Sequence, residues 1–151
     1  MGREISCEVR RKDSDERIWG SYEDQDMFVC GRDDATTFIL SLADESGEID
    51  YLPKMGWIDS SLAAYAAKDR GEINKAKQYL ADMVCARKNA RNYREFSSFN
   101  NPIENTEEWI RDNDWSRAES LVEMLNLAKK AYAAAEADHP GEHRIVILAS
   151  D

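Results

Sequence analysis

The two histidines of the chain lie in the segment HPGEH, and their spacing is one that a metal site could use. On a helix, His139 and His143 would share one face and could bind Zn²⁺ together. Pro140 and Gly141 stand between them and break a helix, and no third ligand accompanies the pair. We therefore expect a helix-ending loop here, with no metal and no cofactor.

Cysteine chemistry is the next possibility. Cys7, Cys30 and Cys85 are odd in number, far apart, and never form a C-x-x-C pair. A nucleophilic thiol would need one of the two histidines beside it, and nothing in the sequence places one there. We expect reduced and mostly buried thiols with a structural role.

Carboxylates are abundant, with thirty Asp and Glu residues in 151. Abundance makes general acid–base catalysis hard to assign, since thirty carboxylates always include close pairs. The calcium pattern of an EF-hand is missing its central glycine and distant glutamate, and no glycine-rich phosphate loop follows a strand. The sequence therefore predicts a protein that is not an enzyme.

The excess of acidic residues is concentrated in one region of the chain. Residues 13–59 hold thirteen acidic and three basic groups, an excess equal to the net charge of −10. Complementary charge accelerates association and sets specificity, so this region is the predicted surface for a protein partner with a basic surface. Its carboxylates form a first acidic patch (Glu23, Asp24, Asp26, Asp33, Asp34) and a second acidic patch (Asp44, Glu45, Glu48, Asp50). The predicted aromatic anchors beside them are Trp19, Tyr22 and Tyr51.

Residues 60–94 have the opposite character, with eight basic and three acidic groups. A basic helix here is the alternative functional face, and it would carry Lys75, Lys77, Arg87, Lys88, Arg91 and Arg94. It could bind phosphate directly. An overall pI near 4.7 disfavours nucleic acid, and we expect the stripe to pair with acidic segments of the same chain or of a second subunit in a homo-oligomer.

The first half of the chain has the alternation of strands. Ile5, Cys7 and Val9 share one face of the first strand. Residues 17–22 and 27–30 are predicted to form a hairpin, 36–42 a strand, although Asp34 could also cap a short helix there, and 49–52 a strand that Pro53 ends.

From residue 59 the period becomes helical. We expect one helix from 59 or 60 to 69 with Gly71 as its terminator, and a second from 72 to 93 or 96. A loop should follow at 97–102, then a short helix from Thr106. Ser116 and Glu119 form a capping box for a long helix to 137. Residues 144–149 complete the pattern as a strand buried on both faces, in the interior of the sheet.

This order of elements predicts one α+β domain of residues 1–151. Residues 1–52 are strand-rich, 59–138 helical, and 143–149 a closing strand. The expected sheet is mostly antiparallel and packs against three to four helices. No apolar run is long enough for a bilayer, and we expect a cytoplasmic protein, in the host cytoplasm if it is viral.

Three functions fit these features. The first is a small, acidic, non-enzymatic inhibitor that binds a basic surface of a nucleic-acid-handling protein, as phage or mobile-element anti-defence (anti-CRISPR-like) factors do. The second is an immunity protein that neutralises a bacterial toxin. The third, from a different class, is a small enzyme or ligand-binding domain with carboxylates in a cleft.

Overall fold

The computed structural model describes residues 3–21, 23–25, 28–30, 33–114 and 116–150. The chain divides into two compact units, and the prediction of one domain of residues 1–151 stays a prediction. Unit 1 comprises residues 1–66 and 117–151, and unit 2 comprises residues 67–116. Unit 2 is therefore an insertion in the sequence of unit 1.

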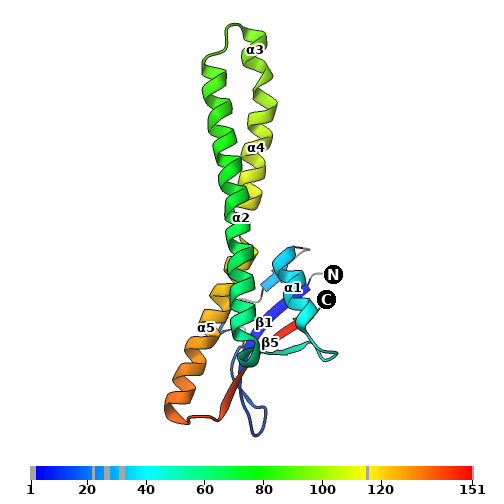
Figure 1. Ribbon diagram of the computed structural model, residues 1–151, viewed down its shortest axis with the longest axis vertical. Helices are drawn as coiled ribbons and strands as arrows, with labels where there is room; N and C mark the ends of the chain where they lie inside the picture. The colour runs from blue at the N-terminus through cyan, green and yellow to red at the C-terminus, as the bar shows by residue number, and fades with distance from the viewer. Residues whose placement is uncertain (1–2, 22, 26–27, 31–32, 115, 151) are drawn as a thin grey trace. The chain divides into compact units, whose positions relative to one another are not determined.

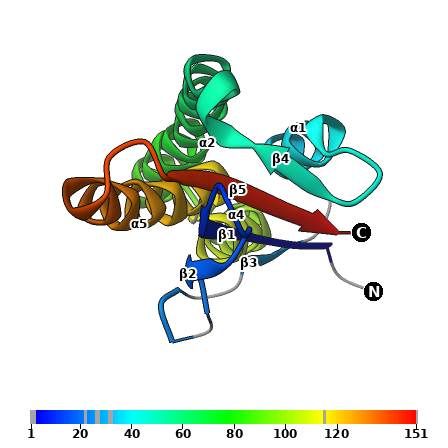
Figure 2. The same cartoon turned by 90° about the horizontal axis from the view of Figure 1, so that it is seen from below.

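Unit 1 contains a five-stranded sheet in which every pairing is antiparallel, and its helices pack on that sheet, so the α+β prediction is confirmed. The strand order is β2-β1-β5-β4, with β3 also paired to β1 (Figure 2). The strands are β1 (Arg3–Arg11), β2 (Arg17–Trp19), β3 (Phe28–Cys30), β4 (Glu48–Asp50) and β5 (His143–Ser150).

The last strand lies inside the sheet, as its unbroken apolar run predicts. β5 pairs with β1 on one side and with β4 on the other. Ile145, Val146 and Ile147 are consecutive and all buried, so both faces of β5 are covered. The predicted interior position is confirmed.

The predicted hairpin of residues 17–22 and 27–30 is wrong, because β2 and β3 both pair with β1 instead of with each other. β2 pairs with Val9 and Arg10, and β3 pairs with residues 3–5, which leaves Cys7 between them. The buried amide of Gln25 fills this gap. It accepts from the Cys7 N–H at 3.1 Å and donates to the Cys7 carbonyl at 2.7 Å and to the Gly20 carbonyl at 2.8 Å.

Residues 36–42 are helical, which corrects the predicted strand. Helix α1 (Asp34–Leu42) begins at Asp33, whose carboxylate accepts from the Thr36 N–H at 3.0 Å and from its hydroxyl at 2.7 Å. This N-cap, together with a buried face of Ala35, Thr36 and Ile39, outweighs the strand preference of β-branched and aromatic residues.

Helices α1 and α5 pack on the inward face of the sheet (Figures 1 and 2). Helix α5 (Arg117–Asp138) ends one residue beyond its predicted end. The core joins Ile5, Cys7 and Val9 of β1 to a set of buried helical residues, which are Ile39, Ile58, Leu62, Ala118, Leu121, Met124, Leu125 and Ala128.

The break predicted at residues 70–71 is absent, because α2 runs unbroken from Tyr51 to Lys88. Pro53 is the third residue of this helix. The amide that proline lacks has no partner in a first turn, so Pro53 fits in the first turn of the helix instead of ending a strand. Gly71 lies in the helix interior, and the part of α2 from residue 67 onward belongs to unit 2.

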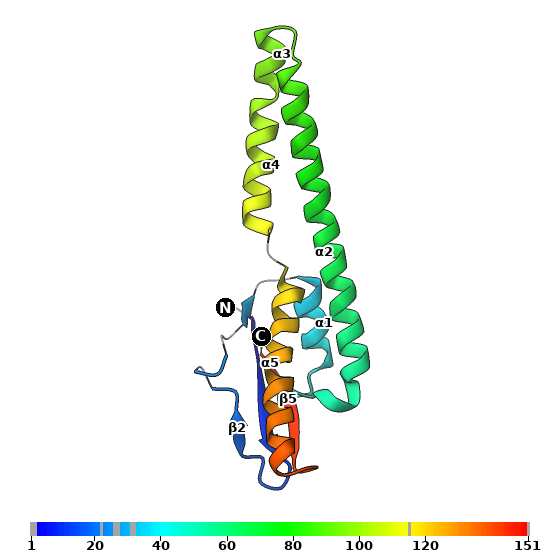
Figure 3. The same ribbon diagram turned by 90° about the vertical axis from the view of Figure 1, so that its left-hand side faces the viewer.

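Unit 2 is a helical hairpin in which α3 (Tyr93–Ser98) and α4 (Asn100–Asn113) return alongside α2 (Figure 3). The loop predicted at 97–102 is therefore wrong. Asn92 caps α3 by accepting from the Glu95 N–H at 2.8 Å. Pro102 is the third residue of α4, the same tolerated position as that of Pro53 in α2.

Replacing Gly71 with alanine should raise the free energy of unfolding by up to about 1 kcal/mol, because alanine is the better helix former at an exposed interior position. A Cβ added at Gly71 meets no atom within 4 Å. Urea denaturation followed by far-ultraviolet circular dichroism measures the change. Ala81→Gly, at an exposed position of the same helix, should have the opposite effect; a loss of stability in Gly71→Ala would mean that α2 ends there.

Replacing Gln25 with alanine should destabilise unit 1 by about 2–4 kcal/mol, because it leaves the Cys7 N–H and carbonyl buried without partners. The same denaturation experiment measures this loss. Glu23→Ala, an exposed change two residues away, is the matched control and should stay within about 0.5 kcal/mol of the wild type. Equal stability of the two variants would show that Gln25 does not hold this edge of β1.

Candidate protein-binding site

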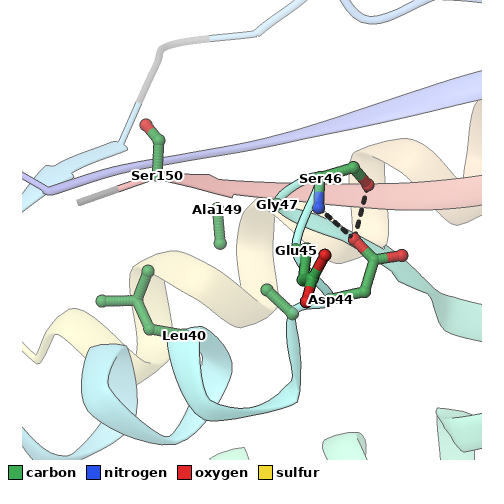
Figure 4. A pocket seen from close by; sticks show the side chains of 8 residues that line it. Leu40, Asp44, Glu45, Ser46, Gly47, Ala149 and Ser150 are labelled. Carbon is green, nitrogen blue, oxygen red and sulfur yellow. Dashed lines mark hydrogen bonds between the residues drawn. The ribbon is translucent and has the colours of Figure 1, made fainter.

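An open hollow of about 400 Å³ lies in unit 1 where α1 ends (Figure 4). Leu40 and Ala43 give it an apolar wall, and Asp44 and Glu45 supply carboxylates. The remaining lining comes from Ser46, Gly47, Ala149 and Ser150. Residues 43–47 are called the acidic loop below.

The acidic loop is electronegative for two reasons. A helix C-terminus carries partial negative charge, and α1 has no basic residue in its last turn to offset it. Asp44 and Glu45 follow at once and are both exposed. A cation entering the hollow therefore meets a helix end and two carboxylates together.

Asp44 also organises the loop (Figure 4). Its Oδ1 accepts from the Ser46 N–H at 2.8 Å, from the Ser46 hydroxyl, and from the Glu48 N–H at 3.2 Å. The Ser46 hydroxyl and these backbone groups lower the pKa of Asp44 below its ordinary value. Its carboxylate thus stays ionised while it fixes the turn.

Gly47 fastens the acidic loop to the end of β5. Its carbonyl accepts from the Ala149 N–H at 2.8 Å, and its φ is +81°, a conformation that side chains other than glycine rarely adopt. A Cβ at this position would lie 2.8 Å from the Ala149 carbonyl oxygen. The close approach of two backbones therefore requires glycine here.

The second acidic patch is only partly free. Glu45 and Asp50 are exposed, whereas Glu48 accepts from Arg10 at 2.9 Å. Tyr51 is fully buried, which corrects its prediction as an aromatic anchor for a partner. Its hydroxyl donates to Asp59 at 2.6 Å, and Lys129 donates to the other oxygen of the same carboxylate at 2.9 Å.

Capping accounts for much of the first acidic patch. Asp24 accepts from the N–H groups of Gly20 and Ser21, which lower its pKa. Asp33 caps α1, and its carboxylate also lies 3.7 Å from the guanidinium of Arg117. Glu23 and Asp34 are exposed. Trp19 is half-buried and packs against the core, and the predicted residues Tyr22 and Asp26 lie outside the described part of the chain.

The structure does not gather the two patches into one surface. Asp33 and Asp34 stand at the start of α1, while Asp44 and Glu45 follow its end. The helix of nine residues between them is about 14 Å long. The acidic side chains of the two patches thus lie at both ends of α1, and the hollow lies only at the C-terminal end of this helix.

The basic-helix alternative lies wholly in unit 2. Lys77 is 3.4 Å from Asp114, and Arg91 is 3.3 Å from Glu95, so both pair within the unit. Arg87 donates to Asn100 at 3.2 Å and lies over the Phe96 ring at 5.4 Å. Lys75, Lys88 and Arg94 are exposed.

The other candidate chemistries find no assembled site. Within the residues that the structure describes, no three His, Cys, Asp or Glu side chains are grouped to hold a metal ion. His143 is buried and His139 exposed. Burial raises the pKa of Cys7 to about 12, which keeps it a neutral thiol. Cys85 is exposed, contrary to the expected burial.

Sequence reasoning found the carboxylates of the acidic loop but missed the apolar and backbone parts of the hollow. Leu40 belonged to a predicted strand, and Ala43 to the segment between that strand and the next, so their place beside a helix end was not foreseen. The signal for Gly47 was available, since glycine following Asp and Ser is typical of a turn with positive φ. Nothing in the sequence places Ala149 beside it.

Comparison of the chain with models of protein families, with curated proteins and with solved structures found no match. None of the helices in the described ranges has the length and hydropathy needed to cross a membrane.

Replacing Gly47 with alanine should cost about 2–4 kcal/mol of unfolding free energy, since the new Cβ meets the Ala149 carbonyl in addition to the strain of a positive φ. Gly141→Ala is the matched control. Its φ of +80° is nearly the same, but no atom lies within 4 Å of the added Cβ, so about 1 kcal/mol is expected. Urea denaturation measures both, and equal losses would contradict the close contact.

Proposed function

We propose that unit 1 is a non-catalytic binding module whose acidic surface engages a basic surface of a nucleic-acid-handling protein and inhibits it. One observation carries the proposal. Unit 2 holds nine basic and nine acidic residues, whereas unit 1 holds eleven basic and twenty-one acidic, so unit 1 carries the whole net charge of −10. Negative charge concentrated on one unit creates an electrostatic field that attracts a basic partner before the two proteins touch.

The hollow beside the acidic loop gives this field a local point of recognition. A lysine or arginine side chain of the partner would lay its aliphatic stem against Leu40 and Ala43 and place its charge near Asp44 and Glu45. Lowered carboxyl pKa values at Asp24 and Asp44 support a surface that keeps its charge. Proteins that bind nucleic acid present such lysines and arginines in their phosphate-binding grooves.

The acidic surface of unit 1 would inhibit its partner by occupying the site that otherwise binds the phosphate groups of nucleic acid. The bound unit 1 would hold basic side chains that otherwise contact the nucleic-acid backbone, so nucleic acid and this protein would compete for one surface. Electrostatic association of this type weakens as salt rises. Competition and salt dependence are the two measurable consequences.

Reversing two free charges tests the proposal. Glu45→Lys with Asp50→Lys changes exposed side chains and leaves Asp44 to hold the loop. The immobilised protein is exposed to nuclease-treated lysate of the cells that produce it, and each retained protein is then purified and titrated. We expect at least tenfold weaker binding to the double variant, and displacement of nucleic acid from the retained protein by the wild type.

The matched control reverses the same number of charges in unit 2. Glu104→Lys with Glu107→Lys alters two exposed carboxylates of α4 and gives the same net charge as the unit 1 variant. It should bind nearly as well as the wild type. Equal losses in the two double variants would show that net charge alone, and not the surface of unit 1, controls binding.

A further inference from the structure

Unit 2 is a hairpin with a thin apolar seam. Among its described residues, the buried apolar side chains are Ile73, Met83 and Ile103, and Leu80 and Ile110 are half-buried beside them. Helices in proteins gain most of their stability from packing of an apolar face. Three buried side chains in two arms of this length are few, so the hairpin gains stability if something covers it.

Three side-chain contacts between the two arms fix their register. Arg70 and Lys77 on α2 both bind Asp114 at the end of α4, at 3.1 and 3.4 Å. Arg87, farther along α2, donates to Asn100 at the start of α4. In these contacts, the residue number on α2 and the residue number on α4 add up to about 187 for positions at the same level of the hairpin. Tyr79 and Trp109 satisfy this relation, so they lie level with each other.

Helix geometry places these two aromatic residues on the same side. Tyr79 immediately precedes Leu80 of the seam, and Trp109 immediately precedes Ile110. A step of one residue turns about 100° around a helix, and in antiparallel arms the residue before a seam position points to the same side of the hairpin. Tyr79 and Trp109 are 57% and 41% exposed, so this side is open.

A second layer of this side has the same arrangement. Arg87, which is half-buried two turns after Leu80, continues the seam on α2. Ala86 precedes Arg87 and Pro102 precedes Ile103, and both are exposed and level with each other. The four side chains of Tyr79, Ala86, Pro102 and Trp109 are uncharged and are called the aromatic face. Glu72 and Asp82, which precede Ile73 and Met83, lie on the same side and flank it.

Charge on the two arms decides what fits the aromatic face. Residues 67–88 of α2 hold six basic and three acidic groups, whereas α4 holds one basic and four acidic. A second copy that lays its α4 on α2 of the first joins net charges of +3 and −3 twice. A copy that lays α2 on α2 joins like charges.

We propose that the aromatic face is a self-association surface, on which two hairpins pair side by side with their turns at the same end to form a four-helix bundle. The two-fold axis runs along the hairpins, so each α2 contacts α4 of the second copy. Because Tyr79 and Trp109 are level, each Tyr79 meets the second copy's Trp109. On the rim, Lys75 lies level with the second copy's Asp112.

This arrangement buries what one hairpin leaves exposed. Aromatic pairs contribute about 0.5–1.5 kcal/mol beyond the area they bury, and the small side chains of Ala86 and Pro102 allow the helices to approach. The symmetry supplies two such pairs. The association rests on unit 2 alone and is independent of the partner proposed for unit 1.

Sedimentation velocity of the full chain between 5 and 200 µM tests the association. We expect a species of twice the 17.3 kDa chain mass, and a monomer when Tyr79→Glu is combined with Trp109→Glu. Tyr93→Glu, which changes a side chain that is 82% exposed in α3, is the control and should leave the dimer intact. A wild-type monomer throughout this range, as expected if another protein covers the face, would overturn the proposal.

Disulfide crosslinking tests the arrangement without depending on the stability of the glutamate variants. In a background with serine at positions 30 and 85, Tyr79→Cys and Trp109→Cys are made as separate proteins. Mixing them should give a heterodimer disulfide at least tenfold more abundant than either homodimer under mild oxidation. Preferential Tyr79→Cys homodimers would show α2 against α2, and equal yields of all three would show random collision; either result contradicts the proposal.

Discussion

The pairing of β1 with β5 is the constraint on which unit 1 depends. Eight residue pairs, from Glu4 with Ser150 to Arg11 with His143, join the two strands. β2 and β3 then attach to β1, and β4 attaches to β5, so every other strand is held through this one ladder. On the outer face Arg10 binds Glu8 on its own strand and Glu48 on β4, and thereby links strands that are not neighbours.

Local sequence patterns predicted the parts of this fold that local physics decides. An unbroken run from Ile145 to Leu148 predicted an interior strand, and the periodicity after Ser116 predicted α5, because burial on two faces and burial along one stripe leave distinct patterns. The errors share one cause. Pro53, Gly71 and Pro102 were taken as boundaries, yet a helix tolerates each at its position. The two prolines lie in first turns, where the missing amide has no partner to lose, and a glycine in an exposed helix interior costs only about 1 kcal/mol.

The candidate site was predictable in charge and unpredictable in geometry. Counting carboxylates located the acid correctly on the part of the chain that became unit 1. It did not distinguish Asp24, Asp33 and Asp44, whose carboxylates hold their own turns, from Glu45 and Asp50, which remain exposed. A capping carboxylate and a recognition carboxylate have the same sequence signature, since both occur in polar turns. The distinction appears only when the backbone N–H groups around each side chain are placed.

The strands β1 and β5 lie far apart in the sequence, and this separation affects how the chain folds. Arg144 binds Asp15, which lies 129 residues earlier, so the sheet of unit 1 can assemble only after nearly the whole chain has been made. The contacts of unit 2 close much shorter loops and can form during synthesis, ending with the Ser116 hydroxyl on Asp69, 47 residues earlier. Such early closure shortens the remaining loop, but by loop-entropy arguments this is worth only about 0.4 kcal/mol, roughly a twofold effect. Unit 1 should therefore be the slow-folding part of the molecule, because the edge of β1 that pairs with β5 stays open until the last strand is made.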